Sequence, residues 1–229
     1  GKGVLIGFTM EETEEILQQI FEKNIFGEAG QQVVIEEYLR GEEASILAIS
    51  DGSRFILLEA SQDHKKAFDG DRGPNTGGMG AYSPTPFVSA ELMKEIARRI
   101  VGPTIRGMRE EGCPFQGVLY VGVMITKEGP FVLEYNVRFG DPEAQAVLPR
   151  LKSDLLRVML RSARGCLWWP YLSWDPCSSV CVVMSSQGYP EAYETGKEIK
   201  GLDLIGEKKD TLVFAAKKSF AYFLNTFFS

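Results

Sequence analysis

Residues 133–143, with the sequence LEYNVRFGDPE, alternate apolar and polar side chains in the pattern of a strand. Successive strand side chains point to opposite faces. The packing face is then expected to hold Phe131, Leu133, Tyr135 and Val137. The opposite face would hold Glu134, Asn136 and Arg138, so that the Glu and Asn oxygens converge on Mg²⁺ or Mn²⁺ while Arg138 meets an anion. The alternative is an ordinary half-exposed strand whose outer face is polar.

Composition and charge narrow the classes of protein. The chain has 229 residues, 44% of them hydrophobic and 24% charged, which is typical of a soluble globular protein of one large domain or two small ones. It has no apolar run near the roughly 20 residues of a membrane span, and its start, GKGVLIGFTMEE, lacks the order of a signal peptide. We therefore predict a cytoplasmic protein with no membrane partner. The net charge of −6 argues against nucleic acid and for a small phosphorylated ligand.

The cysteines do not favour a structural metal. Cys113, Cys166, Cys177 and Cys181 include one C-x3-C pair, but a zinc site would need further ligands that the single histidine, His64, cannot readily provide. The sequence predicts reduced, mostly buried thiols.

The N-terminal part is predicted to be a helix against a small antiparallel sheet. Thr9 and Glu12 form a candidate capping box for a helix that runs to about Lys23. Apolar runs predict strands at 33–37, 44–50 and 54–59, and Asp51-Gly52 predicts a hairpin turn between the last two.

Further along, residues 69–86 hold five glycines and three prolines, which predicts a long loop, and long loops are usually functional. Ser89 is expected to cap a helix to about Glu111, with a bend at Gly102-Pro103. A second hairpin is predicted from strands at 117–126 and 130–137. Beyond it we expect a helix over 154–164, capped by Ser153, and a strand over 180–184.

Two other segments are candidates for ligand contacts. The strand and linker VVIEEYLRGEE, residues 33–43, could offer backbone groups to an adenine edge and a carboxylate to a ribose; the alternative is a solvated acidic strand end. The glycines between Gly73 and Gly80 let backbone amides approach a phosphate or carboxylate without Cβ interference, although they do not match a Walker motif. The alternatives here are a glycine-rich surface turn and, for the preceding Asp63-His64-Lys65-Lys66, a solvated loop.

Read together, these segments carry a family resemblance. VVIEEYLRGEEAS, QDHKKAFDGDRGPNTGGMGAYSP, GVLYVGVMI, LEYNVRFGDPE and LKSDL follow one another as in the glycinamide ribonucleotide synthetases (phosphoribosylamine–glycine ligases), which are ATP-grasp enzymes of purine biosynthesis. The resemblance extends over residues 1 to about 202. PNTGGMGAY distinguishes this family from most other ATP-grasp ligases.

The resemblance implies an α+β ATP-grasp fold, with a small helix-covered antiparallel sheet and a larger antiparallel sheet with helices, truncated at both ends. The implied domains are a partial small subdomain at 1–60, a central subdomain at 61–202 and an incomplete C-terminal region with an atypical tail at 203–229. Of the family's N-terminal domain and glycine-rich flap, only the ending Gly1-Lys2-Gly3 is recognised.

The resemblance also implies the reaction and its residues. Glycine would be joined to 5-phosphoribosylamine through glycyl phosphate, with ATP and Mg²⁺ or Mn²⁺. The metal would be held by Glu134 and Asn136, with Arg138 as the catalytic residue. ATP would be bound by Lys2, Glu36, Glu37, Tyr38, Leu39 and Glu43, the segment 36–39 forming the adenine hinge. The substrate and phosphate side would be lined by Asp63, His64, Lys65, Gly77, Gly78, Met79, Gly80, Gly140, Asp141 and Lys152.

Because the flap strand is not recognised, we expect this chain to have little or no ligase activity. The alternative function is a non-catalytic fragment or regulatory isoform that binds ATP and Mg²⁺. The partners implied are glycine and 5-phosphoribosylamine, with fusion to or association with other purine-pathway enzymes.

Overall fold

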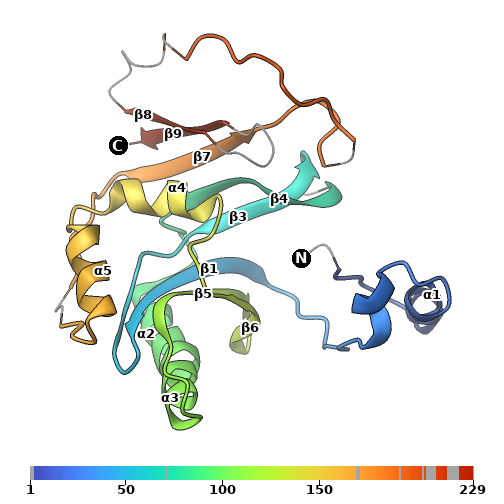
Figure 1. Cartoon of the computed structure of the whole chain (residues 1–229), viewed down its shortest axis with the longest axis horizontal. Coiled ribbons are helices and arrows are strands. Elements are labelled where there is room, and N and C mark those ends of the chain that lie inside the picture. The colour runs from blue at the N-terminus through green and yellow to red at the C-terminus, as the bar shows by residue number, and fades with distance from the viewer. Residues whose placement is uncertain are drawn as a thin grey trace. The chain divides into compact units, whose positions relative to one another are not determined.

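The computed structural model describes residues 3–70, 72–168, 171–190, 192–202, 204, 210–215 and 222–228. They fall into two compact units, Gly1–Arg40 and Gly41–Ser229, each considered by itself (Figure 1). The first unit contains α1 (Met10–Phe21) and the 3₁₀ turn η1 (Gly27–Gln31). The strands of the second unit are β1 (Glu42–Asp51), β2 (Phe55–Leu57), β3 (Gln62–Phe68), β4 (Arg72–Ser83), β5 (Gln116–Thr126), β6 (Gly129–Asn136), β7 (Ser178–Met184), β8 (Thr211–Ala215) and β9 (Tyr222–Phe228). Its helices are α2 (Ala90–Ile96), the π segment η2 (Ala97–Val101), α3 (Gly102–Glu110), α4 (Glu143–Val147), the 3₁₀ turn η3 (Leu148–Arg150) and α5 (Leu155–Ala163).

The first unit begins with the predicted capping box. The amide of Glu12 donates to Thr9 Oγ1 at 3.1 Å, and the carboxylate of Glu12 accepts from the amide of Phe8 at 2.7 Å. The strand predicted at 33–37 is wrong, because residues 33–40 form no strand in the structure. A strand needs a ladder partner, and the described part of this unit contains only a helix and a 3₁₀ turn. Val34 and Ile35 are accordingly 83% and 76% exposed.

Strands β2-β1-β5-β6 form an antiparallel sheet in that order, with both predicted hairpins present. Central strand β1 is buried on both faces, which explains its nearly continuous apolar sequence. Alternate residues such as Ile46 pack with Ile96 of α2 and Ile105 of α3, while Leu47 packs on the other face with Val158 of α5. Helices from later in the chain thus cover both faces of this hairpin, and the partnership predicted between it and an N-terminal helix stays a prediction.

The predicted interruption at Gly102-Pro103 is a π segment between α2 and α3. Ser89 caps α2 by accepting from the Leu92 amide at 3.2 Å, as predicted. Proline has no N–H to donate, and the preceding Gly102 amide donates five residues back to Ala97 O. The wider turn keeps Ile100 and Val101 in the core.

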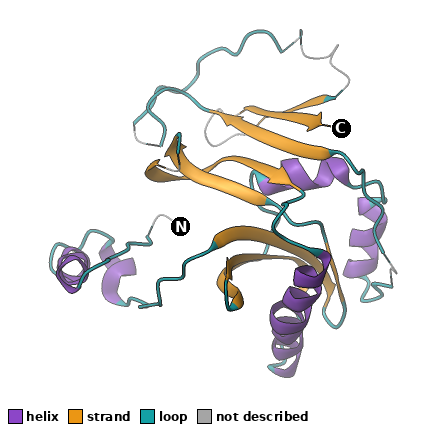
Figure 2. Cartoon of the chain, turned by 180° about the vertical axis from the view of Figure 1, so that it is seen from behind, coloured by secondary structure: helices purple, strands orange, loops and turns teal. Residues whose placement is uncertain are grey.

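Strands β3-β4-β7-β9-β8 form a second sheet, and Figure 2 shows the two sheets of this unit as separate layers. The loop predicted at 69–86 is wrong, because Arg72–Ser83 form strand β4. Its glycines permit close contacts between backbones: a Cβ on Gly80 would lie 2.8 Å from Cys181 O on β7. The tail predicted to be atypical contributes β9, which pairs with both β7 and β8.

The short helix α4 packs on both sheets. Ala146 contacts the cluster of Ala81 and Cys181 in the second sheet, whereas Val147 belongs to the core against the first sheet. Downstream, α5 is capped by Asp154, which accepts from the Arg157 amide at 3.1 Å. The predicted cap, Ser153, is instead an acceptor for the Ser173 amide.

Arg150 is a buried cation at the end of η3, only 3% exposed. Its guanidinium donates to Glu59 at 3.2 Å, to Ser83 Oγ at 2.9 Å and to the carbonyls of Asp175 and Cys177. The ring of Trp174 lies beneath it, 6.0 Å from the guanidinium carbon. This network joins the segment after β2 and the last residue of β4 to the segment before β7.

All four cysteines are free thiols, but the expectation that most are buried is wrong. Cys113 and Cys166 are exposed, Cys177 is half-buried and Cys181 is buried. Burial raises the pKa of Cys181 to about 12. Among the helices described, none has both the length and the apolar character that crossing a membrane requires.

Candidate nucleotide and metal site

Charged side chains from the two sheets of the second unit come together on one side of β3. Lys65 Nζ lies 3.1 Å from Glu43 Oε2 and 3.8 Å from Asp63 Oδ2. Burial opposes the charge on Lys65, but Asp63 and Glu43, with a contribution from Glu134, hold the Lys65 pKa above its ordinary value. Burial raises the pKa of Asp63, against the attraction of Lys65. The structure thus brings together residues 43, 63, 65 and 134, which were predicted from three separate segments.

Glu134 and Asn136 lie opposite Gly122 and Tyr120 in the β5-β6 ladder. The side chain of Glu134 passes over Gly122, whose absent Cβ would lie 3.2 Å from Glu134 Cγ. Tyr135 points the other way, with its hydroxyl 2.9 Å from Thr104 Oγ1 on α3. The predicted alternation over residues 134–136 is therefore confirmed.

The alternation breaks down on either side of these residues. Glu134 pairs with Gly122 but Val132 pairs with Val123, so Leu133 is the extra residue of a β-bulge. The bulge leaves Val132 packed against the core under α2 and α3, which the two-residue period did not predict. Arg138 lies beyond the end of β6 and donates to Phe139 O at 2.8 Å, so its placement on the strand face with Glu134 is wrong.

The donor chemistry of Glu134 and Asn136 fits a hard divalent cation. Within the residues described, no group of three or more His, Cys, Asp or Glu side chains could hold a metal ion. A carboxylate and an amide oxygen alone do not complete a shell, and Mg²⁺ commonly takes the remaining ligands from water and phosphates. The two residues fit an ion that binds with a nucleotide and do not resemble a permanent structural site.

Two amides in the glycine run of β4, those of Gly77 and Gly78, are hydrogen-bonded within the chain. The Gly77 amide donates to Tyr189 Oη at 3.1 Å, and the Gly78 amide donates to Thr76 Oγ1 at 3.0 Å. Gly80 lies within the ladder between β3 and β7. The anion contacts predicted for Gly77, Gly78 and Gly80 stay predictions.

Gly78 is required sterically. Its φ is +114°, and a Cβ there would overlap Cδ of Pro142 in the segment after β6. Gly78→Ala is expected to lower the free energy of unfolding by about 2–3 kcal/mol, since backbone strain and overlap add. Urea unfolding measures this.

The control for Gly78→Ala is Gly107→Ala on α3, where a Cβ would meet nothing within 4 Å. That variant is expected to be more stable than the wild type by about 0.5–1 kcal/mol. Equal destabilisation by both substitutions would contradict the steric role of Gly78.

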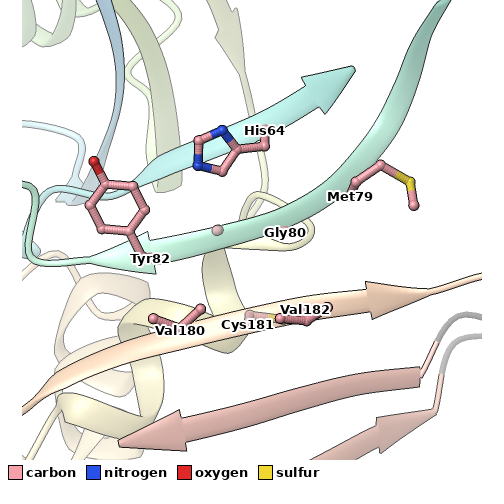
Figure 3. Close-up of a pocket in the computed structure, with 8 residues that line it drawn as sticks. His64, Met79, Gly80, Tyr82, Val180, Cys181 and Val182 are labelled. Atoms are coloured by element: carbon pink, nitrogen blue, oxygen red, sulfur yellow. The ribbon is translucent and has the colours of Figure 1, made fainter. Parts of the chain in front are cut away.

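His64 and Met79 line a different part of the second sheet. His64 lies between Asp63 and Lys65 on β3 and therefore points to the opposite face, where its ring stacks on Tyr82 at 6.0 Å. Figure 3 shows His64 and Tyr82 on neighbouring strands above Val180. The hollow there is lined by His64, Met79, Gly80, Ala81, Tyr82, Val180, Cys181 and Val182. The structure does not bring His64 together with Asp63 and Lys65.

The other predicted residues are dispersed. Asp141 Oδ1 accepts from Gln145 Nε2 at 2.9 Å, and Gly140 O accepts from the Ala144 amide. Lys152 is exposed and pairs with Asp175 at 3.0 Å. The Cys177 amide and Lys152 together lower the pKa of Asp175 to about 2.

The predicted ATP contacts Lys2 and 36–39 belong to the first unit, whereas Glu43 belongs to the second. Lys2 lies outside the described residues. Glu36, Glu37 and Tyr38 are exposed, Leu39 is half-buried, and Tyr38 packs edge-on against Phe8 with ring centroids 5.3 Å apart.

Sequence reasoning missed a buried polar group beside the metal face. Ser45 Oγ donates to Glu143 Oε1 at 3.0 Å and lies 2.9 Å from Tyr120 Oη. Burial, with the nearby Asp63, raises the pKa of Glu143. Burial also raises the pKa of Tyr120, and Glu143 raises it further. The sequence signal for this polar group was a serine and a tyrosine within otherwise apolar strands.

Comparison with known proteins gives the family to which the chain is similar. Residues 1–144 match the family described as phosphoribosylglycinamide synthetase, ATP-grasp (A) domain. The chain is 51% identical over 205 residues to the phosphoribosylamine–glycine ligase of Arabidopsis thaliana, which is named chloroplastic. The alignment covers 89% of this chain and 38% of that protein. It is 51% identical over 202 residues to the trifunctional purine biosynthetic protein adenosine-3 of Bos taurus, covering 88% of this chain and 20% of that protein.

The fold comparison agrees. The crystal structure of the phosphoribosylamine–glycine ligase from Thermotoga maritima superposes with a TM-score of 0.76 at 34% identity, covering 99% of this chain and 56% of that one. The predicted α+β ATP-grasp fold is confirmed. The chain spans 38% of the Arabidopsis protein and 49% of a ligase from Vibrio vulnificus. By its sequence and its fold, this chain belongs to the phosphoribosylglycinamide synthetase family and carries that family's ATP-grasp domain.

Proposed function

We propose that this chain supplies the nucleotide-binding part of a phosphoribosylamine–glycine ligase. The reaction would join glycine to 5-phosphoribosylamine, with ATP converted to ADP and phosphate through glycyl phosphate. The observation that carries the proposal is the face of Glu134 and Asn136, which lies near Lys65, Asp63 and Glu43 in a chain of this family. Phosphoryl transfer depends mainly on positioning and charge neutralisation, which these residue types supply.

Each residue has a proposed part in binding. Glu134 and Asn136 would hold Mg²⁺ or Mn²⁺, which when bound would neutralise charge on the β- and γ-phosphates. Lys65 would exchange one of its two carboxylate partners for a phosphate oxygen. Arg138 is exposed, and turning its guanidinium away from Phe139 O would let it bind the transferring group.

The segment 36–39 and Glu43 are proposed for the adenine and ribose. Asp63, the glycine run and Asp141 are proposed for the substrate side.

A cytoplasmic location stays a prediction, since the Arabidopsis relative is named chloroplastic. Fusion to other purine enzymes is supported by the trifunctional name of the bovine relative.

The proposal is tested by nucleotide binding to the purified 229-residue chain. Isothermal titration calorimetry with ATP is expected to give saturable binding in Mg²⁺ and much weaker binding in EDTA, because the acidic face otherwise repels the phosphates. GTP serves as the specificity control. Equal heats with and without Mg²⁺ would contradict the proposed site.

A glycine-dependent ADP assay then distinguishes a ligase from the alternative, a non-catalytic ATP-binding fragment. Magnesium-dependent binding without turnover would favour the fragment.

A further inference from the structure

Glu143 is a buried carboxyl group held by hydroxyls. It opens α4 and is 3% exposed. The Ser45 hydroxyl donates to Glu143 Oε1 at 3.0 Å and lies 2.9 Å from the Tyr120 hydroxyl. A buried carboxyl group with these neighbours fixes the positions of the Ser45 and Tyr120 hydroxyls, because a buried hydroxyl without a hydrogen bond costs free energy.

The same carboxyl group fixes the turn that precedes it. Its side chain folds back over Gly140, where a Cβ would overlap Glu143 Oε2. The Ala144 amide donates to Gly140 O at 3.0 Å, and the Gln145 amide donates to Pro142 O at 3.2 Å. The segment 138–142, which carries Arg138 and Asp141, is thereby attached at its C-terminal end.

The hydroxyls lie in the same strand rows as the proposed metal ligands. Ser45 pairs with Gly122, which pairs with Glu134, and Tyr120 pairs directly with Asn136. Glu134 also shares the face of Tyr120, since both lie within 3.6 Å of the Cβ position of Gly122. The Ser45 and Tyr120 hydroxyls, which lie beside Glu143, and the two proposed metal ligands therefore occupy two neighbouring rows of cross-strand pairs in one sheet.

We infer that Glu143 is a positioning residue that, through Ser45 and Tyr120, fixes segment 138–142 in register with Glu134 and Asn136. Arg138 and the metal ligands then face the same phosphate. The hydrogen bonds are properties of the chain without ligand, and only the consequence for phosphate binding rests on the proposed function.

The first test uses the nucleotide-free chain and does not depend on that function. Hydrogen exchange at the amides of Ala144 and Gln145 is expected to be about tenfold faster in Ser45→Ala and Glu143→Ala than in wild type, since each loses a hydrogen bond that holds the turn. Ser50→Ala is the matched control, because Ser50 is also a buried serine of β1 but bonds to Phe115 O at 2.9 Å. Unchanged exchange in both site variants, or equal acceleration in Ser50→Ala, would overturn the inference.

The second test separates positioning from general destabilisation. Glu143→Ala is expected to weaken ATP binding in Mg²⁺ about tenfold while changing ADP binding less than about twofold, because segment 138–142 acts on the terminal phosphate. Glu143→Gln keeps an acceptor oxygen for Ser45 and is expected to restore most of the ATP affinity. Equal losses for ATP and ADP, or no rescue by glutamine, would overturn it.

The two tests also separate the two claims. Should the wild-type chain bind no nucleotide, the proposed function fails, and the exchange rates still decide whether Glu143 fixes the segment. Ser45→Ala provides the same comparison if Glu143→Ala does not fold.

Discussion

Replacing Glu134 with alanine is expected to remove most of the Mg²⁺-dependent affinity of this chain for ATP. The loss should be about 100-fold or more, since even outer-shell partners of a bound metal are worth about 10–100-fold in affinity. Glu134 contributes the charged ligand of the pair, and Asn136 contributes only a neutral oxygen, so Asn136→Ala should lose less. Calorimetric titration with ATP in Mg²⁺ and in EDTA measures both effects.

The control is Glu128→Ala, in the turn of the same hairpin. This substitution makes the same change in net charge at an exposed position between β5 and β6. It should leave ATP affinity within about twofold of wild type, because charges at the exposed surface are screened. Equal losses at the two positions would show that hairpin charge, and not metal ligation, controls binding.

Replacing Arg150 with alanine is expected to cause the largest loss of stability. Removing one partner of a buried ionic network costs about 3–5 kcal/mol, because Glu59, Ser83 Oγ and two carbonyls lose their donor. Urea unfolding followed by tryptophan fluorescence is suitable, since Trp174 lies against the guanidinium. Arg150→Lys should rescue only part of the loss, because an ammonium group cannot reproduce the planar set of donors.

Arg99→Ala provides the comparison for Arg150. Arg99 forms a 2.7 Å ion pair with Glu95, one turn away on a helical surface, with both side chains more than a third exposed. Exposed pairs of this kind are worth at most about 1 kcal/mol. A similar loss from both substitutions would mean that the buried network contributes little beyond its charge.

The parts of the fold that were predictable depend on local chemistry. Asp51-Gly52 specifies a hairpin because Gly52 adopts a φ of +93°, and Thr9 and Ser89 specify helix starts because their hydroxyls accept nearby amides. Strand β4 was missed because glycines and prolines normally indicate a loop. There the pairing of β3 and β7 on either side overrides local propensity.

The residues of the candidate site were predictable only where they lie on one strand. Glu134 and Asn136 follow from the two-residue period, but a single bulge at Leu133 and the end of β6 at Asn136 displaced the other expected positions. The group of Ser45, Tyr120 and Glu143 joins residues 75 and 98 positions apart. No local pattern identifies such partners, because tertiary packing brings them together.

The position of β9 between β7 and β8 has a consequence for self-association. If the chain ended before residue 222, β7 would become an edge strand and β8 would lose the neighbour to which it is hydrogen-bonded. An uncovered edge offers a row of free backbone donors and acceptors to another molecule. Exposed Val182 and Met184 add apolar surface to that strand, so we expect β9 to reduce aggregation of this chain.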